Sequence, residues 1–97
     1  MEQNNVVGIV SEREKNTLLK FYERKLANEE LLLSLKENYF IEEDKNIFMN
    51  KVSEDMKETK ENIEKWWSEK SSKYNWKGKK NGFWEIKFET NEIILRE

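Results

Sequence analysis

The chain contains no proline and only three glycines, and Gly78 and Gly82 lie close together near its C-terminal end. Glycine and proline are the residues that most often interrupt a helix. Where both are missing, apolar side chains at helical spacing can continue from one turn to the next. This distribution predicts a mostly helical chain, with its irregular segments and any strands near the two ends.

The first helical segment has a clear start. Ser11 and Glu14 have the spacing of a capping box, in which each side chain accepts a hydrogen bond from the other residue's backbone amide. Apolar residues at helical spacing then predict a helix over residues 12–27: Leu18, Leu19, Tyr22 and Leu26. Asn28 and the two acids after it resemble a second helix start, so the segment either continues to about residue 40 or bends near Asn28. The absence of glycine and proline favours continuity.

A longer helix is expected after the acidic run of residues 42–44, with Asp44 as its N-cap residue. Its inward stripe follows a heptad-like spacing: Phe48, Val52, Met56, Thr59, Ile63, Trp66 and Lys70. The carboxylates of residues 42–44 could also bind Mg²⁺ or Ca²⁺, but the run lacks EF-hand spacing and a glycine. A helix start explains it better, and the helix is expected to end near residues 71–72.

Strands are expected at both ends of the chain. Residues 6–10 form a β-branched run typical of a buried strand, with an apolar arm packed on a helix as the alternative. Residues 73–82 are expected to form a loop, and residues 83–96 alternate like a hairpin. A two-residue turn at Thr90 and Asn91 would pair Phe88 with Ile93 and residue 86 with residue 95, which brings the apolar side chains onto one face.

These segments predict one small domain, residues 1–97, of the α+β class. It has two or three helices, the third one long, and a C-terminal β-hairpin that the short N-terminal strand could join. A domain of this size buries only about 60–65% of the surface of its unfolded chain. A partner or a second copy could therefore contribute to its stability.

The composition excludes several chemistries. Cysteine and histidine are absent, so the chain has no disulfide, thiolate nucleophile, Cys/His zinc site or imidazole base. There is no glycine-rich phosphate loop, and no apolar run approaches the ~20 residues of a membrane span. We therefore expect a cytoplasmic protein that is not an enzyme, needs no cofactor and does not enter a membrane. An enzyme that uses only carboxylate, lysine or tyrosine chemistry is the minor alternative.

Charge and aromatic residues concentrate in residues 65–84, here called the basic aromatic segment. Residues 65–80 carry a net charge of +5, whereas residues 1–64 carry −5. Lysines can contact phosphates and exposed aromatic rings can stack on bases. Alternatively, Trp66, Trp76 and Trp84 are core residues that anchor the hairpin, and the lysines only solvate the loop. The candidate partner-binding residues are Trp66, Trp67, Lys73, Tyr74, Trp76, Lys77, Lys79 and Lys80.

The helices carry more apolar surface than a small domain easily buries. The runs 31–33 and 39–41 place apolar side chains on more than one side of a helix, which favours a protein partner or a homodimer. We therefore expect a small non-enzymatic interaction protein, in an inhibitor, immunity, antitoxin-like or adaptor role. It would bind a macromolecular partner through its helix faces and the basic aromatic segment.

Two other functions remain open. The alternative is a small nucleic-acid-binding regulator with a winged-helix-like C-terminal half. Against it, residues 89–92 make the hairpin tip acidic, and the long helix carries many carboxylates. The third hypothesis is an aromatic pocket near the tryptophans that takes a small ligand.

Overall fold

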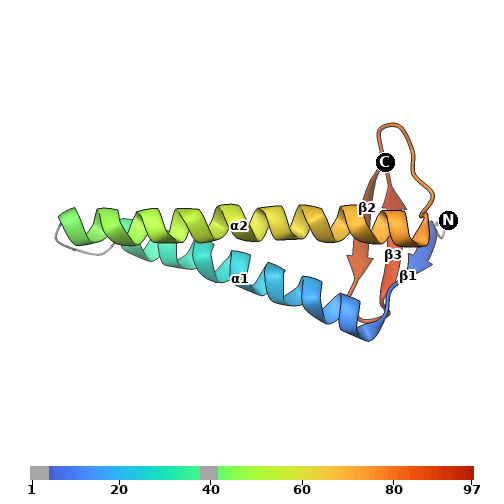
Figure 1. Ribbon diagram of the computed structural model, residues 1–97, viewed down its shortest axis with the longest axis horizontal. Coiled ribbons are helices and arrows are strands. Elements are labelled where there is room, and N and C mark those ends of the chain that lie inside the picture. The colour runs from blue at the N-terminus through green and yellow to red at the C-terminus, as the bar shows by residue number, and fades with distance from the viewer. Residues whose placement is uncertain (1–4, 38–41) are drawn as a thin grey trace. The chain divides into compact units, whose positions relative to one another are not determined.

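The computed structural model describes residues 5–37 and 42–97. The elements follow the order β1 (Val6–Ile9), α1 (Glu12–Glu37), α2 (Glu42–Tyr74), β2 (Phe83–Lys87) and β3 (Glu92–Arg96), as Figure 1 shows. The α+β class, the long helix and the hairpin are as predicted. The described residues form two helices, not three, and the N-terminal strand is part of the sheet.

Helix α1 is continuous through Asn28, so the acids that follow this residue lie inside one helix. Its start is the predicted capping box. The Ser11 amide donates to Glu14 Oε1 over 2.8 Å, and the Glu14 amide donates to Ser11 Oγ over 3.1 Å. The helix is described to Glu37, and the predicted end near residue 40 and the apolar run 39–41 lie outside the described residues.

Helix α2 begins at Glu42, two residues before the predicted cap, so the three acids form its first turn. Negative charge there is favourable because the helix dipole leaves the N-terminus partly positive. The helix continues to Tyr74, beyond the predicted end. Asn75 then takes a left-handed φ of 52°, and the Trp76 amide donates to the Ser71 carbonyl over 3.3 Å. This is a Schellman end, which asparagine tolerates better than most residues.

The sheet is antiparallel in the order β1-β3-β2. The predicted hairpin register is wrong by two residues, because Ile86 pairs with Ile93 and Trp84 pairs with Leu95. A four-residue turn, 88–91, replaces the two-residue turn. Its last residue, Asn91, has a φ of 62° and donates its amide to the Lys87 carbonyl over 2.8 Å. A shift of two residues leaves every strand side chain on its predicted face.

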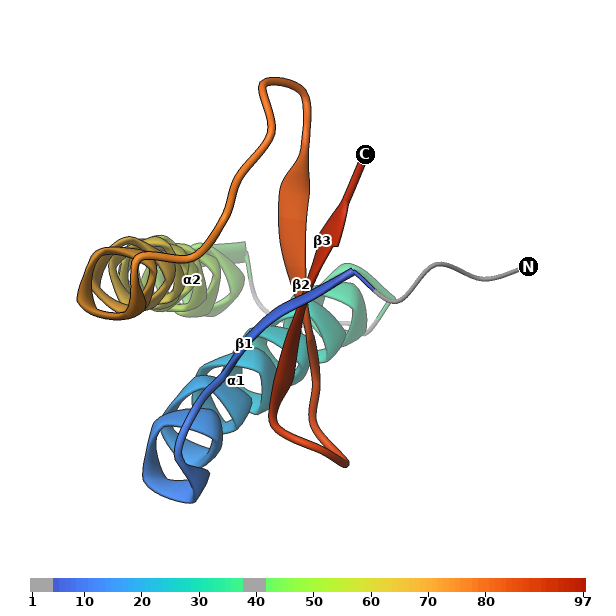
Figure 2. The same cartoon turned by 90° about the vertical axis from the view of Figure 1, so that its right-hand side faces the viewer.

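The chain divides into two compact units, and each has its own buried residues. Unit 1 is Met1–Leu19 with Trp66–Glu97, and unit 2 is Lys20–Lys65. In Figure 2, loop 75–82 arches from the end of α2 to β2 within unit 1. The buried apolar residues of unit 1 are Val10, Leu18, Trp66, Trp76, Ile93, Ile94 and Leu95. In unit 2, Leu35, Val52 and Thr59 are buried.

Two residues assigned to inward stripes prove to be exposed. Leu26 of α1 is 58% exposed, and Phe48 of α2 is 49% exposed. Thr59, a weak member of the predicted α2 stripe, is instead buried at 2%. In the described ranges, neither helix carries an apolar stretch that could cross a bilayer.

Candidate functional site

The basic aromatic segment builds a cluster of rings around Trp76. The Trp76 ring centroid lies 6.4 Å from that of Trp66, 6.1 Å from that of Trp67 and 5.7 Å from that of Trp84. The ring of Tyr74 stacks on Trp76 at 5.9 Å with an interplanar angle of 7°. Edge-to-face and offset-stacked pairs at these distances are favourable beyond their area alone. The cluster therefore connects the C-terminal end of α2 to strand β2.

The Trp76 indole packs directly against Gly8 of β1. A Cβ atom at residue 8 would be 2.3 Å from Trp76 Nε1 and 2.6 Å from Cδ1. Trp76 is only 7% exposed, and its buried Nε1 has no hydrogen-bond partner among the described residues. Trp66 is likewise only 4% exposed. Both indoles fill the core of unit 1 and offer little surface to a partner.

Glu14 is the polar centre of unit 1. Its Oε1 accepts hydrogen bonds from the Ser11 amide and from the Tyr74 hydroxyl. Its Oε2 accepts from Lys73 Nζ at 2.9 Å, and Lys70 Nζ lies 3.7 Å away. The carboxylate is thus held by the start of α1 and by the last turns of α2.

These contacts control the ionisation of the groups involved. Burial alone would raise the pKa of Glu14, but the hydrogen bonds from Lys73, Tyr74 and Ser11 outweigh it and lower the pKa to about 2. The hydrogen bond to Glu14 raises the pKa of Lys73, and donating to the same carboxylate raises the pKa of the Tyr74 hydroxyl. All three pKa values move away from neutrality. These shifts favour a structural role for the ion-pair network over a role in proton transfer.

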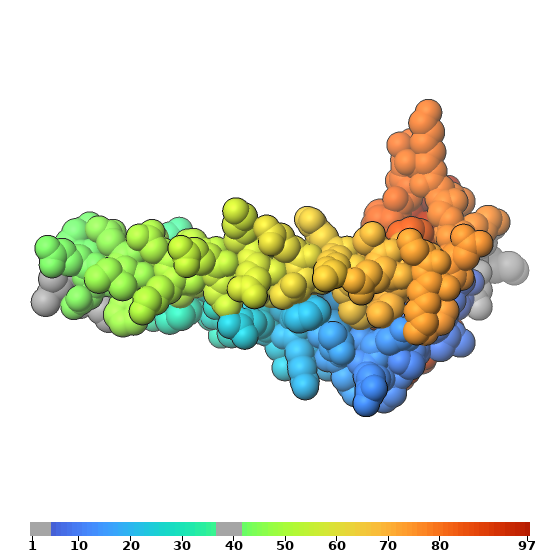
Figure 3. All heavy atoms as spheres, in the orientation of Figure 1, coloured from blue at the N-terminus to red at the C-terminus, as the bar shows by residue number. Residues whose placement is uncertain are grey.

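The predicted lysines divide into two groups. Lys73 is paired with Glu14, and Lys79 is paired with Glu97. Lys77 and Lys80 have no ion pair within the described residues. Both are exposed in loop 75–82, which projects from unit 1 in Figure 3. The loop is fixed at its base, because Trp84 Nε1 donates to the carbonyl of residue 77 over 3.0 Å.

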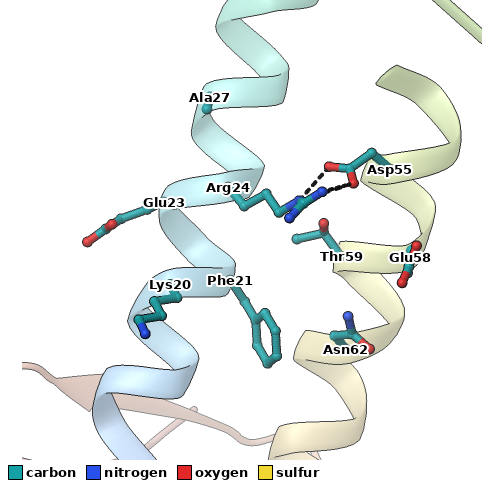
Figure 4. A pocket seen from close by; sticks show the side chains of 9 residues that line it. All are labelled: Lys20, Phe21, Glu23, Arg24, Ala27, Asp55, Glu58, Thr59 and Asn62. Atoms are coloured by element: carbon teal, nitrogen blue, oxygen red, sulfur yellow. Dashed lines mark hydrogen bonds and ion pairs between the residues drawn. The ribbon is translucent and has the colours of Figure 1, made fainter. Parts of the chain in front are cut away.

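Unit 2 contains an open hollow of about 590 Å³ between α1 and α2, shown in Figure 4. Arg24 reaches across it and donates through Nε to both carboxylate oxygens of Asp55, at 3.1 and 2.8 Å. Asn28 donates to the same carboxylate. The Arg24 hydrogen bonds, with that from Asn28, lower the pKa of Asp55 to about 2. This carboxylate is held ionised by its neighbours and is poorly suited to act as a base at neutral pH.

The other side of α1 carries exposed apolar residues. Leu26 is 58% exposed and Leu33, seven residues later, is 57% exposed. Residues seven apart lie on the same side of a helix, and half-buried Tyr22 lies one turn before Leu26 on that side. Leu35 is 3% exposed and lies about 180° around the helix from Leu26. Leu26 and Leu33 therefore lie opposite the buried Leu35 on α1.

Acidic side chains surround these leucines. Glu23, Glu29 and Glu30 are all exposed. At about 100° per residue they lie on both sides of the line through Leu26 and Leu33. We call this surface the α1 outer face, and it comprises Tyr22, Glu23, Leu26, Glu29, Glu30 and Leu33.

Within residues 5–37 and 42–97, no group of three or more acidic side chains is placed to hold a metal ion. The run 42–44, weighed above as a cation site, lies in the first turn of α2. Comparison of the chain with protein-family models, curated proteins and solved structures found no match.

The structure brings together five of the eight predicted site residues. Trp66, Trp67, Tyr74 and Trp76 contact one another in a packed cluster, and Lys73 Nζ lies 5.0 Å from the centroid of the Tyr74 ring. The sequence did not reveal that Glu14 also pairs with side chains of α2, in addition to capping α1. It also did not reveal that Trp76 packs closely against Gly8. The capping box was a usable signal for Glu14. Nothing in the local pattern pointed to its partners on α2, which lie 59 and 60 residues further along the chain.

Proposed function

We propose that this chain is a small non-enzymatic interaction protein that binds another protein through the α1 outer face. The observation that carries the proposal is the exposure of Leu26 and Leu33, each more than half accessible, on one side of one helix. Single exposed leucines are common on protein surfaces. Two at a spacing of seven residues, with Tyr22 in line, make an aligned apolar stripe of the kind that partner helices bind.

The burial of such side chains supplies binding free energy. Fully burying a leucine is worth about 1.5–3 kcal/mol. Leu26 and Leu33 retain more than half of their surface for a partner to cover. The proposal covers inhibitor, immunity, antitoxin-like and adaptor roles together.

The basic aromatic segment gives less support to a nucleic-acid interface. Trp66 and Trp76 are buried, and Lys73 and Lys79 already pair with carboxylates. Glu89 in the hairpin turn adds negative charge to unit 1. In this proposal the segment mainly stabilises unit 1. Tyr74, Lys77 and Lys80 are exposed, and Trp67 is half-buried. The side chains of Lys73 and Lys79 are also about half exposed, although each is paired with a carboxylate.

A photo-crosslinking experiment tests the proposal. A benzophenone amino acid replaces Leu26 in the full chain, inside the cells that produce the protein, and Glu61 is the control position because it is exposed on α2. We expect a discrete crosslinked adduct when the benzophenone is at position 26. This adduct should disappear when Leu33→Asn is also present, and no adduct should form from position 61. Equal adducts from both positions, or an adduct indifferent to Leu33→Asn, would contradict the proposal.

A further inference from the structure

We infer that the partner presents an amphipathic helix whose apolar stripe is flanked by lysines or arginines. This inference rests on the proposed function and adds the chemistry of the partner. It follows from the charges around the exposed leucines, from the spacing of the apolar side chains, and from what these carboxylates would repel.

The first step is the sign of the charge beside the stripe. Taking Leu26 as the centre, Glu30 lies about 40° to one side, and Glu29 and Glu23 lie about 60° to either side. Among residues 22–36, the nearest bases to Leu26 are Lys36 and Lys25, at about 80° and 100°. Within residues 22–33, every charged side chain within about 60° of Leu26 is therefore acidic, and Lys25 and Lys36 lie at the margin of the stripe.

The second step is that these carboxylates are available. Glu23, Glu29 and Glu30 are exposed, and none forms an ion pair within the residues that the structure describes. By contrast, half-buried Asp55 in unit 2 and buried Glu14 in unit 1 are each held by a cation. Three uncompensated negative charges favour a positively charged partner and increase its association rate.

The third step is that the α1 outer face disfavours three other kinds of binding partner. A nucleic acid or an anionic membrane would bring its phosphates against the carboxylates. A second copy of this chain, bound through the same face, would bring Glu23, Glu29 and Glu30 against their own equivalents. Like charges placed together across an interface cost binding free energy. A homodimer through the α1 outer face is therefore disfavoured.

The fourth step is the shape of the partner. Tyr22, Leu26 and Leu33 follow one side of a helix over about 16 Å, at 1.5 Å per residue. Two helices pack along such a length at a shallow crossing angle, with apolar side chains of one between those of the other. A partner helix of about three turns would cover the stripe, and its flanking bases would reach the carboxylates.

Model peptides test the inference with the intact protein. The probe is a fluorescently labelled peptide of about three heptads, with leucines along one face and lysines beside them. Its counterpart carries glutamates in place of the lysines. Fluorescence anisotropy gives the dissociation constant of each peptide at low and moderate salt. We expect the lysine peptide to bind at least about tenfold more tightly than the glutamate peptide.

Variants of the protein locate the contact. Leu26→Asn and Leu33→Asn should each weaken binding of the lysine peptide by about tenfold. Replacement of Glu23, Glu29 and Glu30 by lysine should reverse the preference between the two peptides. The matched control replaces three exposed glutamates of α2 by lysine: Glu54, Glu61 and Glu64. It should leave the affinity of the protein for both peptides unchanged.

Other outcomes overturn the inference and are distinguishable from failure of the proposed function. Equal binding of both peptides, abolished by Leu26→Asn, would refute the basic partner but leave the α1 outer face as a protein-binding surface. Self-association abolished by the same substitution would show that a second copy binds there. Equal effects of the two triple replacements would show that the peptide binds only by non-specific electrostatic attraction. If neither peptide bound and crosslinking at position 26 also failed, both proposals would be wrong.

Discussion

The indole of Trp76 lies so close to Gly8 that a Cβ atom at residue 8 would stand 2.3 Å from its Nε1. None of the described glycines has a positive φ, so this glycine is required for space and not for backbone conformation. Gly8 pairs with Ile93 in the sheet, and Trp76 lies two residues beyond the end of α2. One missing side chain thus lets the aromatic cluster pack against β1.

Substitution Gly8→Ala should destabilise the protein by about 1–3 kcal/mol, because the new methyl group forces Trp76 out of its position. Urea unfolding followed by tryptophan emission measures the change. Gly78→Ala is the matched control, because a Cβ there meets only Trp84 at an ordinary 3.5 Å. If Gly8→Ala were as stable as Gly78→Ala, the close packing of Trp76 on β1 would be wrong.

The residue after α2 offers a second prediction. Asn75 has a φ of 52°, a conformation that costs a β-branched residue about 1–2 kcal/mol. Asn75→Val should lower the free energy of unfolding by about that amount, whereas Asn75→Gly should leave it almost unchanged. Thermal unfolding by circular dichroism compares the two variants. Equal midpoints for valine and glycine would contradict the Schellman end.

Glu14 should make the stability depend on pH in the acid range. Its pKa is lowered from 4.5 to about 2 in the folded protein. Because the folded value lies below the unfolded one, the stabilisation is complete above the unfolded pKa and is lost as the pH falls towards 2. Glu14→Gln should cost about 1–2 kcal/mol at neutral pH and flatten the decline in stability below about pH 5.

Urea unfolding at a series of pH values tests this prediction. Glu64→Gln is the control, because Glu64 is exposed. Part of the acid dependence should remain in Glu14→Gln, since the pKa values of Glu12, Asp55 and Glu97 are also lowered. Identical pH profiles for Glu14→Gln and the unsubstituted protein would show that the ion pairs with α2 do not form.

The contact between Arg24 and Asp55 predicts an NMR result. The hydrogen bonds from Arg24 and Asn28 hold the pKa of Asp55 at about 2, below its ordinary 3.8. Carboxyl carbon shifts followed through an acid titration should show this low value. In Arg24→Gln the pKa of Asp55 should rise towards 3.8. An unchanged titration of Asp55 in that variant would mean that the two side chains are not paired in solution.

Local signals allowed much of the fold to be predicted. The capping box at Ser11 and Glu14, the uninterrupted helix through Asn28 and the alternation of strand residues each depend on a few neighbouring positions. The hairpin register was missed because Asn91 adopts a left-handed conformation that extends the turn to four residues. Strand periodicity cannot detect that extension, since a shift of two residues preserves both faces.

The candidate site was harder to predict because it depends on which side of a helix is covered. Leu26 fits an apolar stripe with Leu18, but Leu18 is fully buried whereas Leu26 is 58% exposed. Spacing identifies an apolar side of a helix and not the element that packs on it. Likewise, the sequence left open whether the tryptophans of the basic aromatic segment form a binding surface or the core, and the structure places Trp66 and Trp76 in the core.

The most direct test of the account is an amide chemical-shift map of the intact protein, labelled with ¹⁵N, as the lysine–leucine peptide is added. The account predicts that perturbed amides concentrate in residues 22–33 of α1, while those of loop 75–82 stay unchanged. Perturbations confined to loop 75–82 and the ring cluster around Trp76, or no perturbation of residues 22–33 at saturating peptide, would contradict it.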